Sequence, residues 1–166
     1  MAMRWRFVDH KASDAALGSN TTFQTVAVNG VSLRVVRFPT GVNGECFFYW
    51  LEDPSYGQSY ARPQFQLAFK TQAGVATGVA DWHIKDVDHV NGELIANPAH
   101  DYKLPHTVSA AGNRVWITPW TIELSVILYR VDGWQVFRVQ RITGGVDTIA
   151  AGLDLISVSF KYRTVA

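Results

Sequence analysis

Pairs of asparagine or aspartate with glycine recur along this chain, each at the end of a short run of β-forming residues. Asn29-Gly30 separates "TFQTVAV" from "VSLRVVRF", and Asp132-Gly133 separates "TIELSVILYRV" from "WQVFRVQRI". These residue types tolerate the positive φ angles that a type I′ hairpin turn requires at both central positions. Further glycine turns are expected at Asn43-Gly44, Asn91-Gly92, Ala111-Gly112-Asn113 and Gly144-Gly145. The repeated turn signals between β-forming runs predict a chain built from antiparallel hairpins.

The runs between these turns alternate with a period of two, which is the period of a β-strand with one buried face. The apolar members of "LISVSFKYR" are Ile156, Val158, Phe160 and Tyr162, and serine, lysine and arginine lie between them. The same alternation predicts strands over 64–70 and 122–129. At the N-terminus, aromatic and methionine positions alternate with arginines, which predicts one more strand containing Met3, Trp5 and Phe7 opposite Arg4 and Arg6.

Helical periodicity is nearly absent from the chain. One short turn is expected in "KASDAALGSN" (11–20), with Ser13 as N-cap and Gly18 as its stop. About 10–12 short strands at close spacing predict an all-β, antiparallel sandwich, most concretely a two-sheet jelly roll. An immunoglobulin-like sandwich and a closed β-barrel are the alternatives. The absence of a repeat or linker predicts a single domain over residues 1–166.

The charge balance limits the partners of this chain. Lysine and arginine number 15 and aspartate and glutamate 14, so the formal net charge is +1, which does not favour nucleic acid. No apolar run approaches the roughly 18–20 residues of a membrane helix, and no signal peptide is recognised. The single cysteine, Cys46, lies in an apolar run and is expected to be a buried thiol. The expected location is a virion or the cytoplasm of the producing cell.

Metal and catalytic motifs are weak. His83 and His89, like His100 and His106, are six residues apart, roughly 20 Å along one strand, which is too far for a shared metal. The stretch "DVDHVNGE" (86–93) is rich in oxygen ligands but fails the EF-hand register. Carboxylates for glycoside hydrolysis are candidates by residue type only: Glu45, Glu52, Asp53, Asp81 and Glu123. We therefore expect no cofactor, no metal and no enzymatic activity.

Aromatic residues are the stronger functional signal. Tyr56 and Tyr60 stand beside Arg62 in the polar loop "EDPSYGQSYARP", and Trp116 and Trp120 flank Pro119. Such rings either fill the core or contact a partner or a sugar. The hairpin strand at 134–141 is apolar on both faces, so one face is expected to meet the core and the other a covering element. Candidate contact residues for a partner or ligand are Tyr56, Tyr60, Arg62, Trp116, Trp120 and Phe137.

Two principal functions compete, and a third follows. The first is a structural virion protein of bacteriophage type, such as a capsid decoration, cement or tail component, which self-assembles (a trimer is favoured) through apolar surfaces and terminal edge strands. The alternative is a carbohydrate-binding or receptor-binding sandwich with a glycan partner. The third is a cupin-like or glycoside-processing enzyme. Neither nucleic acid nor a membrane is an expected partner.

Overall fold

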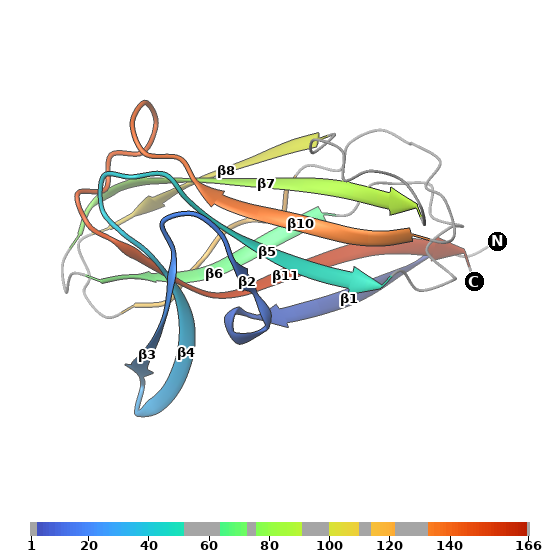
Figure 1. Ribbon diagram of the computed structural model, residues 1–166, viewed down its shortest axis with the longest axis horizontal. Coiled ribbons are helices and arrows are strands. Elements are labelled where there is room, and N and C mark those ends of the chain that lie inside the picture. The colour runs from blue at the N-terminus through green and yellow to red at the C-terminus, as the bar shows by residue number, and fades with distance from the viewer. Residues whose placement is uncertain are drawn as a thin grey trace.

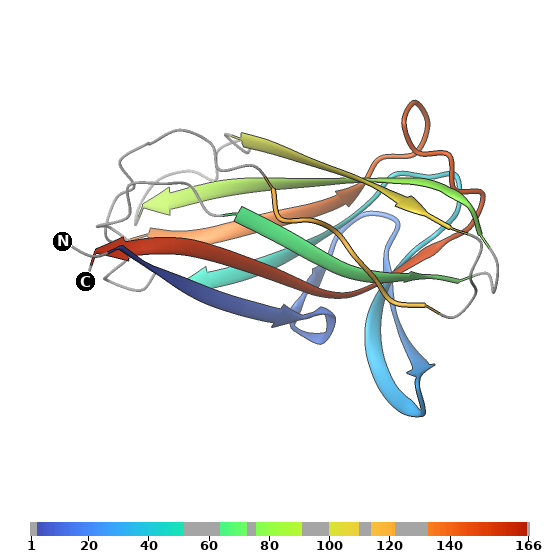
Figure 2. The same ribbon diagram turned by 180° about the vertical axis from the view of Figure 1, so that it is seen from behind.

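The computed structural model describes residues 3–51, 64–72, 76–90, 100–109, 114–121 and 133–165, and two antiparallel sheets pack face to face within them (Figures 1 and 2). The first, sheet A, has the strand order β3-β4-β11-β6-β9, with β1 also paired to β11. The second, sheet B, has the order β2-β5-β10-β7-β8. The predicted antiparallel β-sandwich is therefore confirmed, and the chain passes repeatedly from one sheet to the other, as in a jelly roll.

The strands of sheet A come from both ends and the middle of the chain. They are β1 (Met3–Lys11), β3 (Thr22–Val28), β4 (Val31–Phe38), β6 (Gln64–Thr71), β9 (Trp116–Ile117) and β11 (Leu153–Val165). Sheet B consists of β2 (Ala16–Leu17), β5 (Gly44–Leu51), β7 (Gly78–Val90), β8 (His100–Val108) and β10 (Gly133–Arg141). The two terminal strands, predicted as possible edge strands for neighbouring copies, pair with each other from Met3↔Val165 to Lys11↔Ser157.

The Asn29-Gly30 turn forms as predicted. Val28 pairs with Val31 across it, and the two turn residues have φ angles of 49° and 79°. These are the left-handed angles that a type I′ turn requires. The resulting β3–β4 hairpin projects away from the body of the sandwich (Figure 1). The partner strand of the predicted Asp132-Gly133 hairpin lies outside the described residues, as do the turns at 91–92 and 111–113.

The short helical turn differs from its prediction at the cap. A 3-10 turn (η1) covers Ala12–Asp14, and Lys11 occupies the N-cap position in place of Ser13. The Asp14 carboxylate accepts a hydrogen bond from the backbone N–H of Lys11 at 3.2 Å. A carboxylate three residues after the cap satisfies a free donor of the first turn, so Asp14 stabilises this turn from inside it.

The core between the sheets is aromatic. Phe137 of β10 packs against Phe65 of β6 and Phe160 of β11, with ring centroids 4.9 Å apart in each pair. Trp82 of β7 lies against Phe38 at 5.0 Å. Edge-on and tilted ring pairs at such distances add to the free energy gained from burying the rings. The inner face of β10 is thus the face that carries Phe137 and Val139, both fully buried.

A buried arginine fastens the segment that follows β10. Arg141 has no exposed side-chain surface, and its Nε donates to the Asp147 carboxylate at 2.8 Å. The guanidinium also donates to the backbone carbonyls of Ala151 and Ile149 at 2.8 and 3.0 Å. Because a buried cation is tolerated only when it is paired and hydrogen-bonded, these contacts fix the course of residues 142–151 over the end of the sandwich.

Candidate functional site

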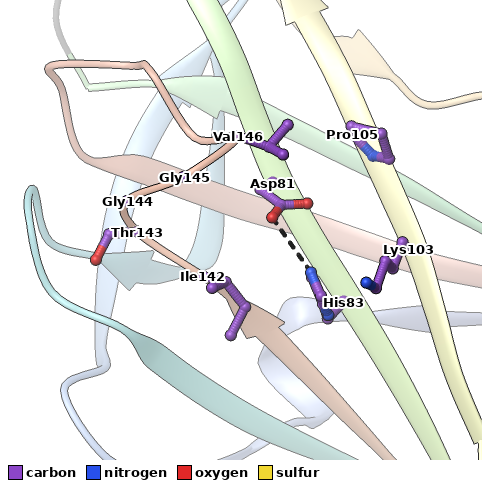
Figure 3. A pocket seen from close by; sticks show the side chains of 9 residues that line it. All are labelled: Asp81, His83, Lys103, Pro105, Ile142, Thr143, Gly144, Gly145 and Val146. Atoms are coloured by element: carbon purple, nitrogen blue, oxygen red, sulfur yellow. Dashed lines mark hydrogen bonds and ion pairs between the residues drawn. The ribbon is translucent and has the colours of Figure 1, made fainter.

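A cleft opens on the outer face of sheet B where the segment after β10 folds over β7 and β8 (Figure 3). Its volume is about 450 Å³. The floor is formed by outward side chains of β7 and β8, and the turn around Gly144-Gly145 forms one wall. The lining residues are Asp81, His83, Lys103, Pro105, Ile142, Thr143, Gly144, Gly145 and Val146. Concave sites with a few convergent polar groups are the usual form of a small-ligand site.

The wall of the cleft is held to the floor by backbone hydrogen bonds. The N–H of Ile142 donates to the carbonyl of Asp81 at 3.0 Å, and the N–H of Thr148 donates to the carbonyl of Val79 at 2.9 Å. Gly144 and Gly145 have φ angles of 92° and 59°, in the left-handed region that favours glycine. The predicted glycine turn therefore shapes the cleft.

His83 joins two carboxylates across the floor of the cleft. Its Nδ1 lies 2.9 Å from an oxygen of Asp101 on β8, and its Nε2 lies 3.2 Å from an oxygen of Asp81 (Figure 3 draws the second contact). The residue is only 9% exposed although it points away from the core, because the neighbouring strand and the 142–146 segment cover it. The orientation of the His83 ring is thus fixed, and its two contacts hold the carboxylates of Asp81 and Asp101 in a defined arrangement.

A row of polar residues crosses sheet B and ends in the cleft. Gln140 of β10 is paired with Glu45 of β5 on one side and with His83 of β7 on the other, and His83 is paired with Lys103 of β8. Adjacent strands are roughly 5 Å apart, so the row extends about 15 Å across the sheet. Gln140 Nε2 donates to Glu45 at 3.0 Å, which orders the row at its far end. Carboxylate, amide, imidazole and ammonium groups together supply both donors and acceptors.

Next to this row the face of sheet B includes aromatic surface. Phe47 and Tyr49 occupy outward positions of β5, and Tyr49 is 51% exposed. Arg138 stands between Phe47 and Lys85 in the neighbouring strands, and its guanidinium lies 3.8 Å from Glu45. The outer face of sheet B therefore combines an exposed ring with a fixed polar array.

The structure separates the two tryptophans that were predicted as contact residues. Trp116 is paired with inward-facing Phe69 and packs against the core, with its ring 6.0 Å from that of His106. Trp120 lies near Phe7 and Lys161 on the outer face of sheet A. They therefore lie on opposite sides of sheet A and do not line one platform. The other loop candidates, Tyr56, Tyr60 and Arg62, lie outside the described residues.

The prediction of Phe137 as a contact residue requires correction. Its side chain has no exposed surface and lies among the phenylalanines of the core, so it cannot touch a partner of the folded chain. The opposite face of β10 carries the half-buried Val136 and Arg138, which lie on the outer face of sheet B. The period of two separated these faces correctly but did not show which one was the core.

The sequence identified some cleft residues only by type. His83 was considered as a metal ligand, which its spacing from His89 did not favour, and Asp81 was one carboxylate among several. Lys103 carried no signal at all, and the Asp101 contact joins strands whose register the sequence did not determine. A usable signal was the alternation in β7, where Asp81, His83 and Lys85 share the face opposite Trp82 and Ile84.

The described residues contain no cluster of metal ligands, and the single thiol, that of Cys46, is buried. Among the described residues, no group of three or more His, Cys, Asp or Glu side chains is arranged to hold a metal ion. Cys46 is buried, as predicted, and burial raises the pKa of its thiol far above the usual value, with Glu45 contributing in the same direction. A thiol with a raised pKa is a poor nucleophile because the thiolate is the reactive form.

The fold belongs to the class of antiparallel β-sandwiches that includes carbohydrate-binding modules. Among solved structures, the chain is similar to the CBM22-1 xylan-binding domain from Paenibacillus barcinonensis Xyn10C, with a TM-score of 0.52, 8% identity and coverage of 96% of this chain and 95% of that one. It is also similar to CBM35 from Cellvibrio japonicus Abf62, with a TM-score of 0.51, 12% identity and coverage of 93% and 92%. At sequence identities this low, the structural similarity shows a common fold and nothing further. No protein-family model and no curated protein matches the sequence.

None of the described helical segments has the length and apolar character needed to cross a membrane.

Proposed function

We propose that this chain is a non-enzymatic carbohydrate-binding module whose saccharide lies along the outer face of sheet B and enters the cleft beside His83. The observation that carries this proposal is the polar row from Glu45 to Lys103, which ends in a concave site with fixed carboxylates. Saccharides expose many hydroxyl groups, each of which both donates and accepts hydrogen bonds. An ordered array of donors and acceptors is therefore complementary to them.

The rigidity of the site supports this proposal. Asp81 and His83 are less than 10% exposed and bonded to each other, so their rotamers are set before a ligand arrives. Binding then costs less conformational entropy than it would with free surface side chains. The half-exposed ring of Tyr49 offers an apolar surface on which the C–H face of a sugar can pack.

The virion prediction has less support. It depended on fold analogy, on apolar surfaces and on terminal edge strands, and the candidate contact residue Phe137 belongs to the core. The similar sandwiches described above are carbohydrate-binding modules, and the outer face of sheet B carries the polar row from Glu45 to Lys103. Both observations favour the glycan-binding alternative over a capsid or tail component. Self-association as a homo-oligomer stays a prediction.

The test is calorimetric titration and affinity electrophoresis of the full chain with neutral soluble polysaccharides, namely xylan, mixed-linked β-glucan and galactan. Lys103→Ala and His83→Ala should each weaken binding about fivefold, the loss expected for one or two hydrogen bonds. Arg114→Ala, at an exposed position outside the cleft, is the matched control and should bind as the wild type does. Absence of binding to every polysaccharide, or equal affinity in all three variants, would contradict the proposal.

A further inference from the structure

A second surface, on the outer face of sheet A, gathers aromatic rings and cations. We call it the aromatic–cationic face and define it by Trp5, Phe7, Trp120, Lys161 and Arg163. The residues of β1 and β11 are cross-strand neighbours, since Trp5 is paired with Arg163 and Phe7 with Lys161. Trp120 reaches the same face from the segment that follows β9 and runs beside β6. Because the cleft lies on the outer face of sheet B, this face lies on the opposite side of the sandwich, whose two sheets are seen as separate layers in Figure 2.

Trp5 and Phe7 do not belong to the core between the sheets. Val8 and His10 are the β1 side chains that pack inward, and His10 stacks on Phe160 at 5.9 Å between ring centroids. Trp5 and Phe7 therefore point outward, and Phe7 is 62% exposed. Large apolar side chains that gather on an exterior sheet face mark an interaction surface more often than a stability device. The sequence assigned no direction to the N-terminal alternation, and the structure shows that its aromatic members Trp5 and Phe7 face away from the core.

The cations of this face are held by the rings. Lys161 Nζ lies 4.7 Å from the ring centroid of Trp5 and 4.6 Å from that of Trp120. The Arg163 guanidinium lies 4.7 Å from the Trp5 ring. Among the described residues no carboxylate forms an ion pair with Lys161, and Asp9, on the same side of β1, is paired in the strand register with Ser159. Two indoles therefore position an ammonium group whose charge no carboxylate among the described residues neutralises.

We propose that the aromatic–cationic face is a second binding site, for an acidic saccharide that carries a carboxylate or a sulfate. The sugar ring packs on the exposed aromatic surface, and its anionic group pairs with Lys161. A cation held between two rings is partly desolvated already, so less hydration is lost when an anion binds. A neutral saccharide can accept hydrogen bonds from this ammonium group but cannot form an ion pair with it.

The extent of the positive charge favours a saccharide over a nucleic acid. Beyond Lys161, the outward positions of β11 are Ser159 and Ser157, and their neighbours in β6 are Gln66 and Ala68. A strand of nucleic acid requires a continuous track of cations along its phosphates, whereas these neighbours are uncharged. Hydroxyl and amide groups beside the two neighbouring cations, Lys161 and Arg163, are complementary to a sugar with one acidic substituent.

The experiment measures binding of the full chain to polygalacturonate, heparin, xylan and a mixed-sequence single-stranded DNA by calorimetry at two salt concentrations. Polygalacturonate presents carboxylates and heparin presents sulfates, so the two distinguish the sources of the anion. Lys161→Gln should weaken binding of the preferred acidic polymer about tenfold, and added salt should weaken it further because the contact is ionic. Arg114→Gln removes the same charge elsewhere and should have little effect on affinity.

The outcomes separate this site from the cleft. The aromatic–cationic face is supported as a site if Trp120→Ala weakens binding of the acidic polymer and His83→Ala does not. The cleft is supported as a separate site if only His83→Ala weakens binding of the neutral polysaccharide. Melting temperatures of all variants show whether a variant has lost its fold, and Lys161→Gln provides a change in charge without loss of a ring. Failure of both acidic polymers to bind, equal loss in Arg114→Gln, or tighter binding of the DNA than of both polymers would overturn the proposal.

Discussion

Replacing Asp147 with alanine should test how the cleft is built, because this carboxylate neutralises a fully buried arginine. Arg141 is 0% exposed and the Asp147 side chain 2%, and two hydrogen bonds of 2.8 and 3.1 Å join them. Removing one partner of a buried pair leaves an uncompensated charge and typically costs about 3–5 kcal/mol. The Asp147→Ala variant should therefore lose about that much of its free energy of unfolding, with a melting temperature lower by roughly 10 °C or more.

Urea denaturation followed by tryptophan fluorescence measures this loss directly. Asp9→Ala is the control, since Asp9 is exposed and its removal should change the free energy of unfolding by less than about 0.5 kcal/mol. Arg141→Met completes a double-mutant cycle. Because the two residues share one interaction, the double variant should cost at least about 1 kcal/mol less than the sum of the single variants. A loss below about 1 kcal/mol in Asp147→Ala, or additive single effects, would refute the assignment of Arg141 and Asp147 as the fastener of this segment.

Two further outcomes follow from the core. Burial lowers the pKa of His10, more than Asp14 and Asp9 raise it, so the folded state binds its proton less readily than the unfolded chain does. Stability should therefore be complete above about pH 6.5 and fall as the pH drops through the lowered pKa, and His10→Phe should flatten this dependence in pH-resolved thermal melts. Phe137→Ala should lower the free energy of unfolding by about 3–5 kcal/mol in urea denaturation, because its ring is fully buried. Val136 lies on the half-buried outer face of the same strand, so Val136→Ala should lower it by less than about half as much. Equal losses in the two variants would contradict the assigned faces.

The strands and one hairpin were predictable because their signals are local. Asn29-Gly30 sets the turn geometry through its own φ angles, and the hydrophobic alternation of "LISVSFKYR" reproduces the buried and outward positions of β11 from Val158 to Arg163. Two-sheet packing follows from strands with one apolar face each. The buried state of Cys46 was predictable in the same way, since a run of apolar residues follows it in the sequence.

The sites were less predictable because they depend on register between distant strands. His83 meets Asp101 only because β7 and β8 pair at His83↔Lys103, and Trp120 meets Lys161 only because the segment after β9 runs along β6. No local pattern contains either pairing. Tyr56 and Tyr60 were selected only as aromatic residues of a polar loop. The aromatic–cationic face was not predicted, because the alternation of Trp5 and Phe7 with arginines does not show which side faces outward.

The sequence by itself determined that this chain forms short antiparallel strands with two chemically distinct faces, since successive side chains in a strand point to opposite sides whatever surrounds them. Only the tertiary structure decided which face of each strand became the core. In β1 the outward face carries Trp5 and Phe7, because Val8 and His10 fit against Phe160 and its neighbours. The physical reason is that burial is a property of packed layers, and a single strand cannot specify the layer that will cover it.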